Sequence, residues 1–382
     1  MKLRRGSPKE AGMSAQRVQY VVDLAKGWVD QGIMPALVIL VARKDVIVAH
    51  EAFGCLTPER DSPPLELDTM FALASLTKPI TATLAMILVE DGLLGLNRPV
   101  SWYIPEFVGE GKDSVMVHHL LTHTSGLRDE DVNAHAKRKR RTVKIPPPDD
   151  TQHPQVNENL FLGYDAPLWK RPGAEMRYCN YGYNLVGEIV RRVSGRSLDD
   201  FARERLFRPL GMKDSYFVVP DSVSHRSVRR SPDIPDAHRD TRAFQKVPWP
   251  RSGAHSTAMD MAIFGQMFLN GGSYNDNSVL SPATVTAMIH NQIPGISAEY
   301  FGRFFPEASW GFGWDVHGDK KAHDRGTLHS PKAFSHSGAG GVFLWVDAVY
   351  RITGVLFGVL INWEEGICID LFMNAVTAAI VD

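Results

Sequence analysis

Three short patterns in the sequence contain side chains that could carry out acyl transfer. The first is Ser75-Leu76-Thr77-Lys78, which opens an apolar helical pattern. Because residues three apart share one face of a helix, the Lys78 amine is expected beside the Ser75 hydroxyl. A serine hydroxyl is a weak nucleophile unless a neighbouring base takes its proton, and a lysine that burial has made easy to discharge is such a base. Ser75 is therefore the candidate nucleophile, and Lys78 is a candidate base.

The place of Ser75 on this helix has a chemical consequence. Pro79 is tolerated only near a helix start, which puts Ser75 at the N-terminal edge. Backbone N–H groups without an intrahelical partner and the positive end of the helix dipole lie at that edge. They would stabilise negative charge that develops near the Ser75 oxygen. A Ser-x-x-Lys spacing often arises by chance, so its meaning depends on the other patterns.

The second pattern is Tyr178-Cys179-Asn180. A phenol can relay a proton between a nucleophile and a leaving group, and an amide can hold a substrate carbonyl or the lysine. Tyr178 and Asn180 are therefore candidate site residues. Taken alone, the pattern is more typical of a turn with a buried tyrosine, and Cys179 is expected to be a packing thiol.

The third pattern is His336-Ser337-Gly338-Ala339 on a strand-like stretch. Gly338 would let a backbone come close to a ligand, because it has no side chain. The N–H of Ala339 could then point into the cleft beside the N–H of Ser75. Two such donors make an oxyanion hole. Alone, this pattern is as uninformative as the other two.

The elements that must position these residues follow from apolar periodicity. Spacing typical of an amphipathic helix covers 18–29, and two runs rich in beta-branched residues predict a hairpin at 36–42 and 46–53. The far end of the chain predicts two strands and then a helix, at 342–346, 352–361 and 367–381.

Strands and helices at both ends of the chain favour one antiparallel sheet covered by terminal helices, which is an α+β fold. We expect two domains. A discontinuous domain from residues 1–70 and 300–382 would hold the sheet, and residues 71–299 would form a mainly helical domain. The active site would lie between them, where pockets commonly form.

The middle of the chain mixes helical spacing with irregular stretches. Helices are predicted at 76–91, 183–194, 198–206 and 259–269. Two polar, proline-containing stretches, 128–166 and 220–250, predict long irregular segments. Segments of this length are usually functional or mobile, so we expect both to form rims of the substrate cleft.

The order of the three patterns, near residues 75, 178 and 336, resembles the motifs of the serine beta-lactamase and penicillin-binding-protein superfamily. Further stretches with the same resemblance lie at 71–75, 119–127, 209–212 and 310–313. The resemblance implies a beta-lactamase/transpeptidase-like fold and acyl transfer in two steps through Ser75. Lys78 and Tyr178 would move the protons, and which of the two is the formal base stays open.

The same resemblance implies roles for the remaining candidates. The N–H groups of Ser75 and Ala339 would form the oxyanion hole, and Asn180, His336 and Gly338 would contact substrate. Class C beta-lactamases carry lysine where this chain has His336, and a histidine is only partly charged near neutral pH. Carboxypeptidases of the group can also carry histidine there.

The sequence is therefore most similar to family VIII carboxylesterases, and we expect hydrolysis of carboxylic esters with short acyl chains. The alternatives are beta-lactamase activity, D-Ala-D-Ala carboxypeptidase or D-aminopeptidase activity on amide bonds, and a ligand-binding module without catalysis. Lactamases and carboxypeptidases work outside the cytoplasm. Because no secretory signal is recognisable after the basic N-terminus, we expect a cytoplasmic protein.

Composition limits the possible partners. Lys and Arg number 42 against 43 Asp and Glu, which gives no global charge for nucleic acid, and no apolar run approaches the roughly 20 residues of a membrane span. His119 and His123 lie four apart without the carboxylate of a zinc motif, so we expect packing or hydrogen bonding and no metal or cofactor. The basic run 137–141 is typical of a solvated surface. A small ester or amide is the expected partner, and the oligomeric state is left open.

Overall fold

The computed structural model describes residues 1–300, 303–318, 320, 326–361 and 367–382. Its largest element is a seven-stranded sheet with the order β1-β3-β2-β13-β12-β11-β10. The strands are β1 (Arg4–Arg5), β3 (Val46–Gly54), β2 (Ala36–Arg43), β13 (Ile352–Gly358), β12 (Val342–Asp347), β11 (Ala333–Gly338) and β10 (Asp315–Val316). Strands from both ends of the chain meet where β2 pairs with β13, as predicted.

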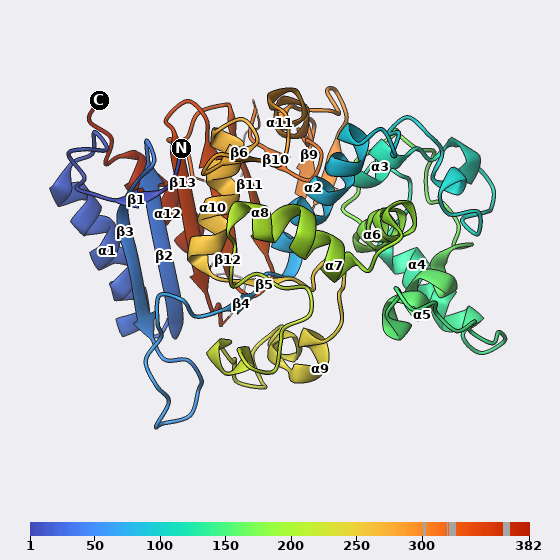
Figure 1. Cartoon of the computed structure of the whole chain (residues 1–382), viewed down its shortest axis with the longest axis horizontal. Helices are drawn as coiled ribbons and strands as arrows, with labels where there is room; N and C mark the ends of the chain where they lie inside the picture. Colours follow the sequence, from blue (N-terminus) through green and yellow to red (C-terminus); the bar gives the residue numbers. More distant parts are fainter. Residues whose placement is uncertain (301–302, 319, 321–325, 362–366) are drawn as a thin grey trace.

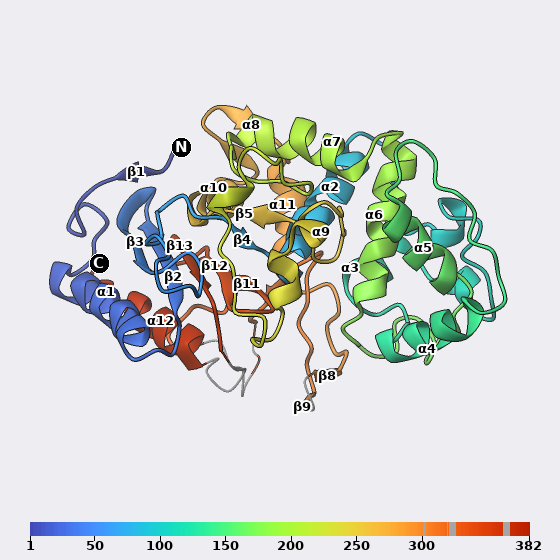
Figure 2. The ribbon, with the colours of Figure 1, turned by 90° about the horizontal axis from the view of Figure 1, so that it is seen from below.

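Helices cover both faces of this sheet, which explains the apolar runs in its central strands. Every residue of β2 and β13 is buried, because neither face meets water. The helices α1 (Ala15–Asp30) and α12 (Ile367–Thr377) pack on one face, and α10 (Ala258–Leu269) packs on the other (Figure 2). The predicted hairpin at 36–42 and 46–53 and both terminal helices are confirmed.

One strand pairing differs from the antiparallel sheet that the sequence predicts. β1 runs parallel to β3, with Arg4 opposite Val46 and Arg5 opposite Ile47, whereas the ladder from β3 to β10 is antiparallel. A strand of two exposed arginines at the sheet edge has no apolar alternation, so no sequence signal announces it.

A mainly helical region lies beside the sheet (Figure 1). At its centre α2 (Thr77–Glu90) packs against α6 (Asn180–Ser194), and both are buried on most sides. All four helices predicted in the middle of the chain are present. The one expected at 198–206 starts as an α-helix and continues as the π-helical turn η4 (Arg203–Phe207).

The other helices are α3 (Val117–Leu121), α4 (Asp129–Lys139), α5 (Pro154–Gly163), α7 (Leu198–Ala202), α8 (Arg208–Leu210), α9 (Arg242–Gln245) and α11 (Pro282–Ile289). The 3₁₀ turns are η1 (Ala74–Leu76), η2 (Val100–Trp102), η3 (Lys112–Ser114), η5 (Ser224–Arg226) and η6 (Ala237–Asp240). Short strand pairs join β4 (Phe71–Ala72) to β5 (His255–Ser256), β6 (Ser273–Tyr274) to β7 (Asn277–Ser278), and β8 (Ala298–Tyr300) to β9 (Arg303–Phe305). Within the described part of the chain, no helix is both long and apolar enough to cross a membrane.

The prediction of an irregular segment at 128–166 is wrong, because the segment contains α4 and α5. α4 has no apolar periodicity, since Val132 is the one fully buried side chain in it. Acidic residues in its first turn and basic residues in its last turn complement the helix dipole instead. The stretch 220–250 holds only the short turns η5, η6 and α9 among irregular backbone, as predicted.

The two predicted domains share packing across their boundary. α10 lies within residues 71–299 but packs on β2, β12 and β13 of the sheet. The division of the chain at residues 70 and 300 therefore stays a prediction.

Candidate active site

Ser75 lies in the 3₁₀ turn η1, which connects β4 to α2. The turn is held by β4, because the Leu73 N–H donates to the Ala254 carbonyl at 2.8 Å and Phe71 pairs with Ser256. Ala74 has a φ of +46°, a left-handed conformation that costs energy for a residue with a side chain. The backbone is thus strained next to Ser75, at the start of the helix as the sequence predicts.

Lys78 lies directly beneath Ser75 and is fully buried. Its Nζ is 3.0 Å from Ser75 Oγ, 2.9 Å from Asn180 Oδ1 and 3.1 Å from the Arg251 carbonyl oxygen. Burial holds the pKa of the Lys78 amine well below its usual value, and the nearby Asp129 carboxylate partly opposes this effect. Among the described residues Lys78 forms no ion pair.

Three oxygen atoms surround the Lys78 amine, so a charged ammonium donates to all three and an uncharged amine donates to two of them. A neutral amine has two N–H donors and one lone pair, and the oxygens of Asn180 and Arg251 can only accept hydrogen bonds. They therefore take the two N–H groups. In that uncharged state the lone pair faces Ser75 Oγ, and the Ser75 hydroxyl would donate to it. Lys78 is consequently placed to receive the Ser75 proton.

Asp129, the first residue of α4, fixes the orientation of Asn180. Its Oδ2 accepts from the Asn180 backbone N–H at 2.9 Å and from Asn180 Nδ2 at 2.8 Å, and its Oδ1 accepts from the Tyr181 N–H at 3.0 Å. The carboxylate therefore caps the start of α6. Because Nδ2 must donate to this carboxylate, Oδ1 of Asn180 is the atom that turns toward Lys78.

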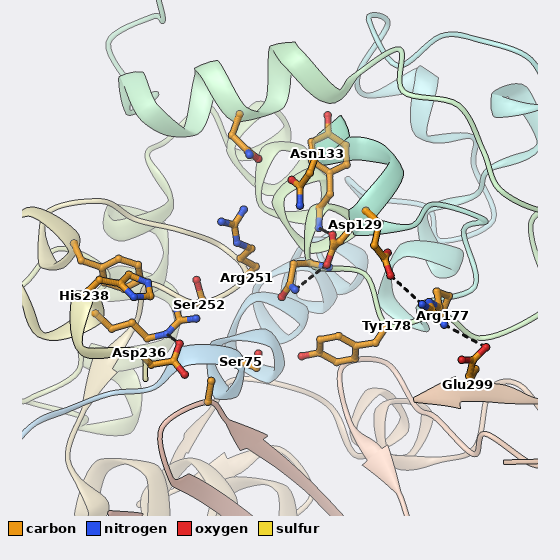
Figure 3. A pocket seen from close by; sticks show the side chains of 17 residues that line it. Ser75, Asp129, Asn133, Arg177, Tyr178, Asp236, His238, Arg251, Ser252 and Glu299 are labelled. Atoms are coloured by element: carbon orange, nitrogen blue, oxygen red, sulfur yellow. Dashed lines mark hydrogen bonds and ion pairs between the residues drawn. The ribbon is translucent and has the colours of Figure 1, made fainter. Parts of the chain in front are cut away.

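Tyr178 borders the same site from the strand-like stretch before α6. Its ring centroid lies 4.7 Å from Lys78 Nζ, and Figure 3 shows its phenol oxygen directed toward Ser75. The ring of His123 packs at 4.3 Å from that of Tyr178, and His123 Nδ1 accepts from the Cys179 N–H at 3.1 Å. Burial lowers the pKa of His123, so this histidine is neutral. It packs and hydrogen-bonds, as predicted.

Cys179 is a packing thiol, as predicted. It is buried, and burial raises the pKa of its thiol well above the usual value, an effect that Asp129 strengthens. A thiol that resists ionisation is a poor nucleophile.

The end of β11 forms the opposite wall of the site. A Cβ at Gly338 would lie 2.1 Å from the Leu73 carbonyl oxygen, so only glycine lets this strand approach the Ser75 turn. Ala339 follows and lines the cavity together with Ser75. His336 is buried, with Nδ1 at 2.7 Å from the Ser337 carbonyl oxygen, and its ring lies 6.4 Å from that of Tyr178.

These residues surround a cavity of about 630 Å³. Of the predicted site residues, Ser75, Tyr178, Asn180 and Ala339 line it, whereas Lys78 lies below Ser75. His336 and Gly338 are not among the residues that line the cavity. Within the described part of the chain, no group of three His, Cys, Asp or Glu residues could hold a metal ion.

Charged side chains also line this cavity. Arg177 pairs with Glu130 at 2.9 Å and with Glu299 at 3.6 Å. Arg239 pairs with an aspartate of the same wall, Asp236, at 3.0 Å.

Sequence reasoning missed two contributors. Asp129 lies two residues after the family-like stretch 119–127, which could have drawn attention to it. Arg251 contributes its backbone carbonyl, a group that every residue has, so no side-chain pattern could reveal it.

Comparisons with known proteins agree with this geometry. The profile of the beta-lactamase family matches residues 21–368. A protein of Salmonella schwarzengrund, provisionally named a D-alanyl-D-alanine carboxypeptidase, is 25% identical over 93% of this chain and 85% of its own length. Two solved structures have the same fold. A family VIII carboxylesterase has a TM-score of 0.75 at 23% identity, and a penicillin-binding protein homologue from Caulobacter crescentus has 0.76 at 23% identity.

Both structures match over 96% of this chain and 99% of their own. Because the family profile covers most of the chain and the fold agrees with it, this protein belongs to the beta-lactamase family of serine hydrolases, with an α+β, beta-lactamase/transpeptidase-like fold.

Proposed function

We propose that the protein hydrolyses carboxylic esters through an acyl-enzyme on Ser75. The observation that supports this most is the position of Lys78, whose amine contacts the Ser75 hydroxyl while two carbonyl oxygens occupy its N–H groups. In this proposal the Lys78 amine is uncharged before the reaction, so it can accept the Ser75 proton directly. Activation of a serine by an adjacent base is the requirement for nucleophilic catalysis.

Acylation begins when Ser75 Oγ attacks the ester carbonyl carbon and its proton passes to Lys78 Nζ. The carbonyl oxygen becomes an oxyanion, which the N–H groups of Ser75 and Ala339 receive. The carbon–oxygen bond to the leaving alcohol then breaks, and the alkoxide takes a proton from the Lys78 ammonium, directly or through the Tyr178 hydroxyl. The products of this step are the free alcohol and an acyl group on Ser75.

Deacylation repeats the step with water. The neutral Lys78 amine, directly or through Tyr178, takes a proton from a water molecule that attacks the acyl carbonyl. The bond to Ser75 Oγ breaks, and the proton returns to that oxygen. The carboxylic acid leaves, and both Ser75 and Lys78 regain their starting states.

One further observation leads us to propose esters, and not amides, as the substrates. The third motif has His336 where class C beta-lactamases have a lysine, and His336 is only 4% exposed and does not line the cavity. This motif therefore supplies no permanent cation for the carboxylate of a beta-lactam or of a terminal D-alanine. The carboxylesterase neighbour supports the same choice, whereas the name of the Salmonella relative favours the amide alternative.

The test combines covalent labelling with a substrate panel. Ser75→Ala is expected to abolish both labelling by an active-site phosphonate and the initial burst of p-nitrophenol from p-nitrophenyl butyrate. Ser252→Ala is the matched control, because Ser252 lines the same cavity and is not in contact with Lys78. Labelling or turnover that survives in Ser75→Ala would rule out the proposal.

Nitrocefin and D-alanyl peptides complete the panel. Faster turnover of either one than of the ester would replace the esterase with the amide-cleaving alternative. Stoichiometric binding without any turnover would identify a binding module.

A further inference from the structure

A second cavity opens beside the first, between α4 and α5. It has a volume of about 700 Å³, and its lining shares Asn133 and Asn159 with the cavity above Ser75. The two cavities therefore adjoin each other at these two asparagines. A substrate whose carbonyl lies at Ser75 can extend past these two asparagines into the second cavity.

Basic side chains dominate the second cavity. Lys137, Arg140 and Arg141 line it, and Glu158 is the acidic residue of the lining. Glu158 pairs with Arg140 at 2.6 Å. Among the described residues Lys137 and Arg141 form no ion pair, so two positive charges remain uncompensated. The first cavity differs, since Arg177 and Arg239 each face carboxylates there.

Arg251 lines the first cavity and contacts a residue of the second. Figure 3 shows its side chain extending from the Ser75 end of the first cavity toward Asn133. Its guanidinium lies 4.7 Å from the ring centroid of Trp249, a residue that lines the second cavity. In the described part of the chain Arg251 has no ion-pair partner, and burial lowers the pKa of its guanidinium. The Asp129 carboxylate of the same cavity attracts this charge without pairing with it.

The helix dipole explains only part of this basic surface. Lys137 lies in the last turn of α4, where a cation interacts favourably with the carbonyl end of the helix. Arg141 follows the end of α4, and Arg251 comes from a loop more than a hundred residues later. Lys137 and Arg141 line the second cavity and Arg251 lines the adjoining first one, so the dipole of α4 does not account for all three charges.

We propose that the second cavity binds an anionic group of the substrate, at a distance from the bond that is cleaved. The inference rests on the proposed esterase function and names its substrate class, esters whose acyl chain ends in a carboxylate or a phosphate-like group. Leu162 and Trp249 provide apolar surface for the chain between carbonyl and anion. Lys137, Arg141 and Arg251 bind the anion.

The experiment compares three p-nitrophenyl esters of equal chain length: octanoate, the suberate monoester and 7-phosphonoheptanoate. For each variant the readout is the ratio of kcat/KM for an anionic ester to kcat/KM for octanoate. The wild type is expected to prefer at least one anionic ester over octanoate. A higher ratio for the suberate monoester indicates a carboxylate site, and a higher ratio for 7-phosphonoheptanoate indicates a phosphate site. The ratio is expected to fall about tenfold in Lys137→Met/Arg141→Met and in Arg251→Met, because a charged hydrogen bond is lost.

Arg138→Met is the matched control, because Arg138 belongs to the same basic run but does not line the cavity. Its ratio is expected to equal that of the wild type. A wild-type ratio at or below one, or an equal fall in Arg138→Met and in Lys137→Met/Arg141→Met, would overturn the inference while leaving the esterase intact. Failure of the wild type to cleave any of the three esters would instead overturn the proposed function, and the inference with it.

Discussion

Among the buried basic side chains, Arg230 and Lys78 have different surroundings. The Arg230 side chain is fully buried against the Asp240 carboxylate, with an N–O distance of 2.5 Å, and the Arg230 backbone N–H donates to the same carboxylate at 2.8 Å. Lys78 is equally buried but faces two carbonyl oxygens and the Ser75 hydroxyl. A buried carboxylate keeps a cation charged, whereas neutral acceptors let it lose its proton.

The Arg230–Asp240 pair and the group around Lys78 also have different roles. The Arg230–Asp240 pair ties the 220–250 stretch to the turn after β11, because Arg230 lies 3.4 Å from the Gly340 carbonyl oxygen. It therefore supports the cavity wall next to Ala339 without taking part in proton transfer. In our account Lys78 has the opposite role: its burial lowers the stability of the fold but makes its amine a base.

The largest expected effect comes from Lys78→Met. Ester kcat/KM should fall by roughly ten-thousand-fold or more, because the Ser75 hydroxyl loses its base. The free energy of unfolding should stay the same or rise, since a poorly compensated buried amine is removed. Lys112→Met is the control, because Lys112 is also buried, with a pKa of about 8, but bonds to the Tyr164 carbonyl instead of Ser75. Turnover within tenfold of the wild type in Lys78→Met would contradict the comparison.

The stability of the wild type should also depend on pH with a definite sign. Folding lowers the pKa of Lys78, so the unfolded chain holds an extra proton between the folded value and about 10.4. The unfolding free energy contributed by Lys78 therefore rises with pH across that window. Urea unfolding at several pH values should show the stability advantage of Lys78→Met shrinking as the pH rises.

Breaking the Arg230–Asp240 pair should mainly lower the free energy of unfolding. Asp240→Ala leaves the Arg230 charge buried and unpaired, so we expect a loss of about 3–5 kcal/mol in unfolding free energy. The control Asp221→Ala breaks the ion pair with Arg242, in which the aspartate is 79% exposed, and should change the unfolding free energy far less, because solvent screens an exposed pair. Chemical denaturation measures both. Equal losses in the two variants would mean that burial does not make the Arg230–Asp240 pair more important for stability than an exposed ion pair.

The smallest expected effect comes from Asp129→Asn, which tests whether the Asp129 carboxylate influences the pKa of Lys78. The acidic limb of the kcat/KM profile should report the pKa of Lys78, and the Asp129 carboxylate raises that pKa. Asp129→Asn should therefore move the limb to lower pH and, by loosening Asn180, lower kcat/KM about tenfold. Asp131→Asn, which changes a carboxylate paired with Arg128 in the same helical turn, should leave the limb in place. A limb that does not move in Asp129→Asn would limit this residue to a structural role.

The sequence predicted the parts of this site that depend on local geometry. Ser75 and Lys78 are three apart on one helix, so their contact follows from helical spacing alone. The apolar runs of β2 and β13 likewise predicted a buried sheet formed from both ends of the chain. Tyr178 and Asn180 came from the order of family-like patterns, since no local rule brings them to Ser75.

What the sequence could not predict depends on tertiary contacts or on backbone atoms. Asp129 reaches Asn180 across 51 residues of sequence. The Arg251 carbonyl is 173 residues from Lys78. α4 was missed because charges at its ends, and not an apolar stripe, support it. For Asn180 and Lys78 the decisive partner is chosen by packing, which sequence spacing does not encode.

The central claim is that Lys78 is an uncharged base in the resting enzyme. The most direct measurement is the rate of Ser75 labelling by a fluorophosphonate as a function of pH, with Asp131→Asn in parallel. The account predicts a rate that levels off well below pH 10, because the Lys78 amine is already neutral there. A rate that continues to climb through about pH 10.4, the range of an ordinary lysine, would contradict it.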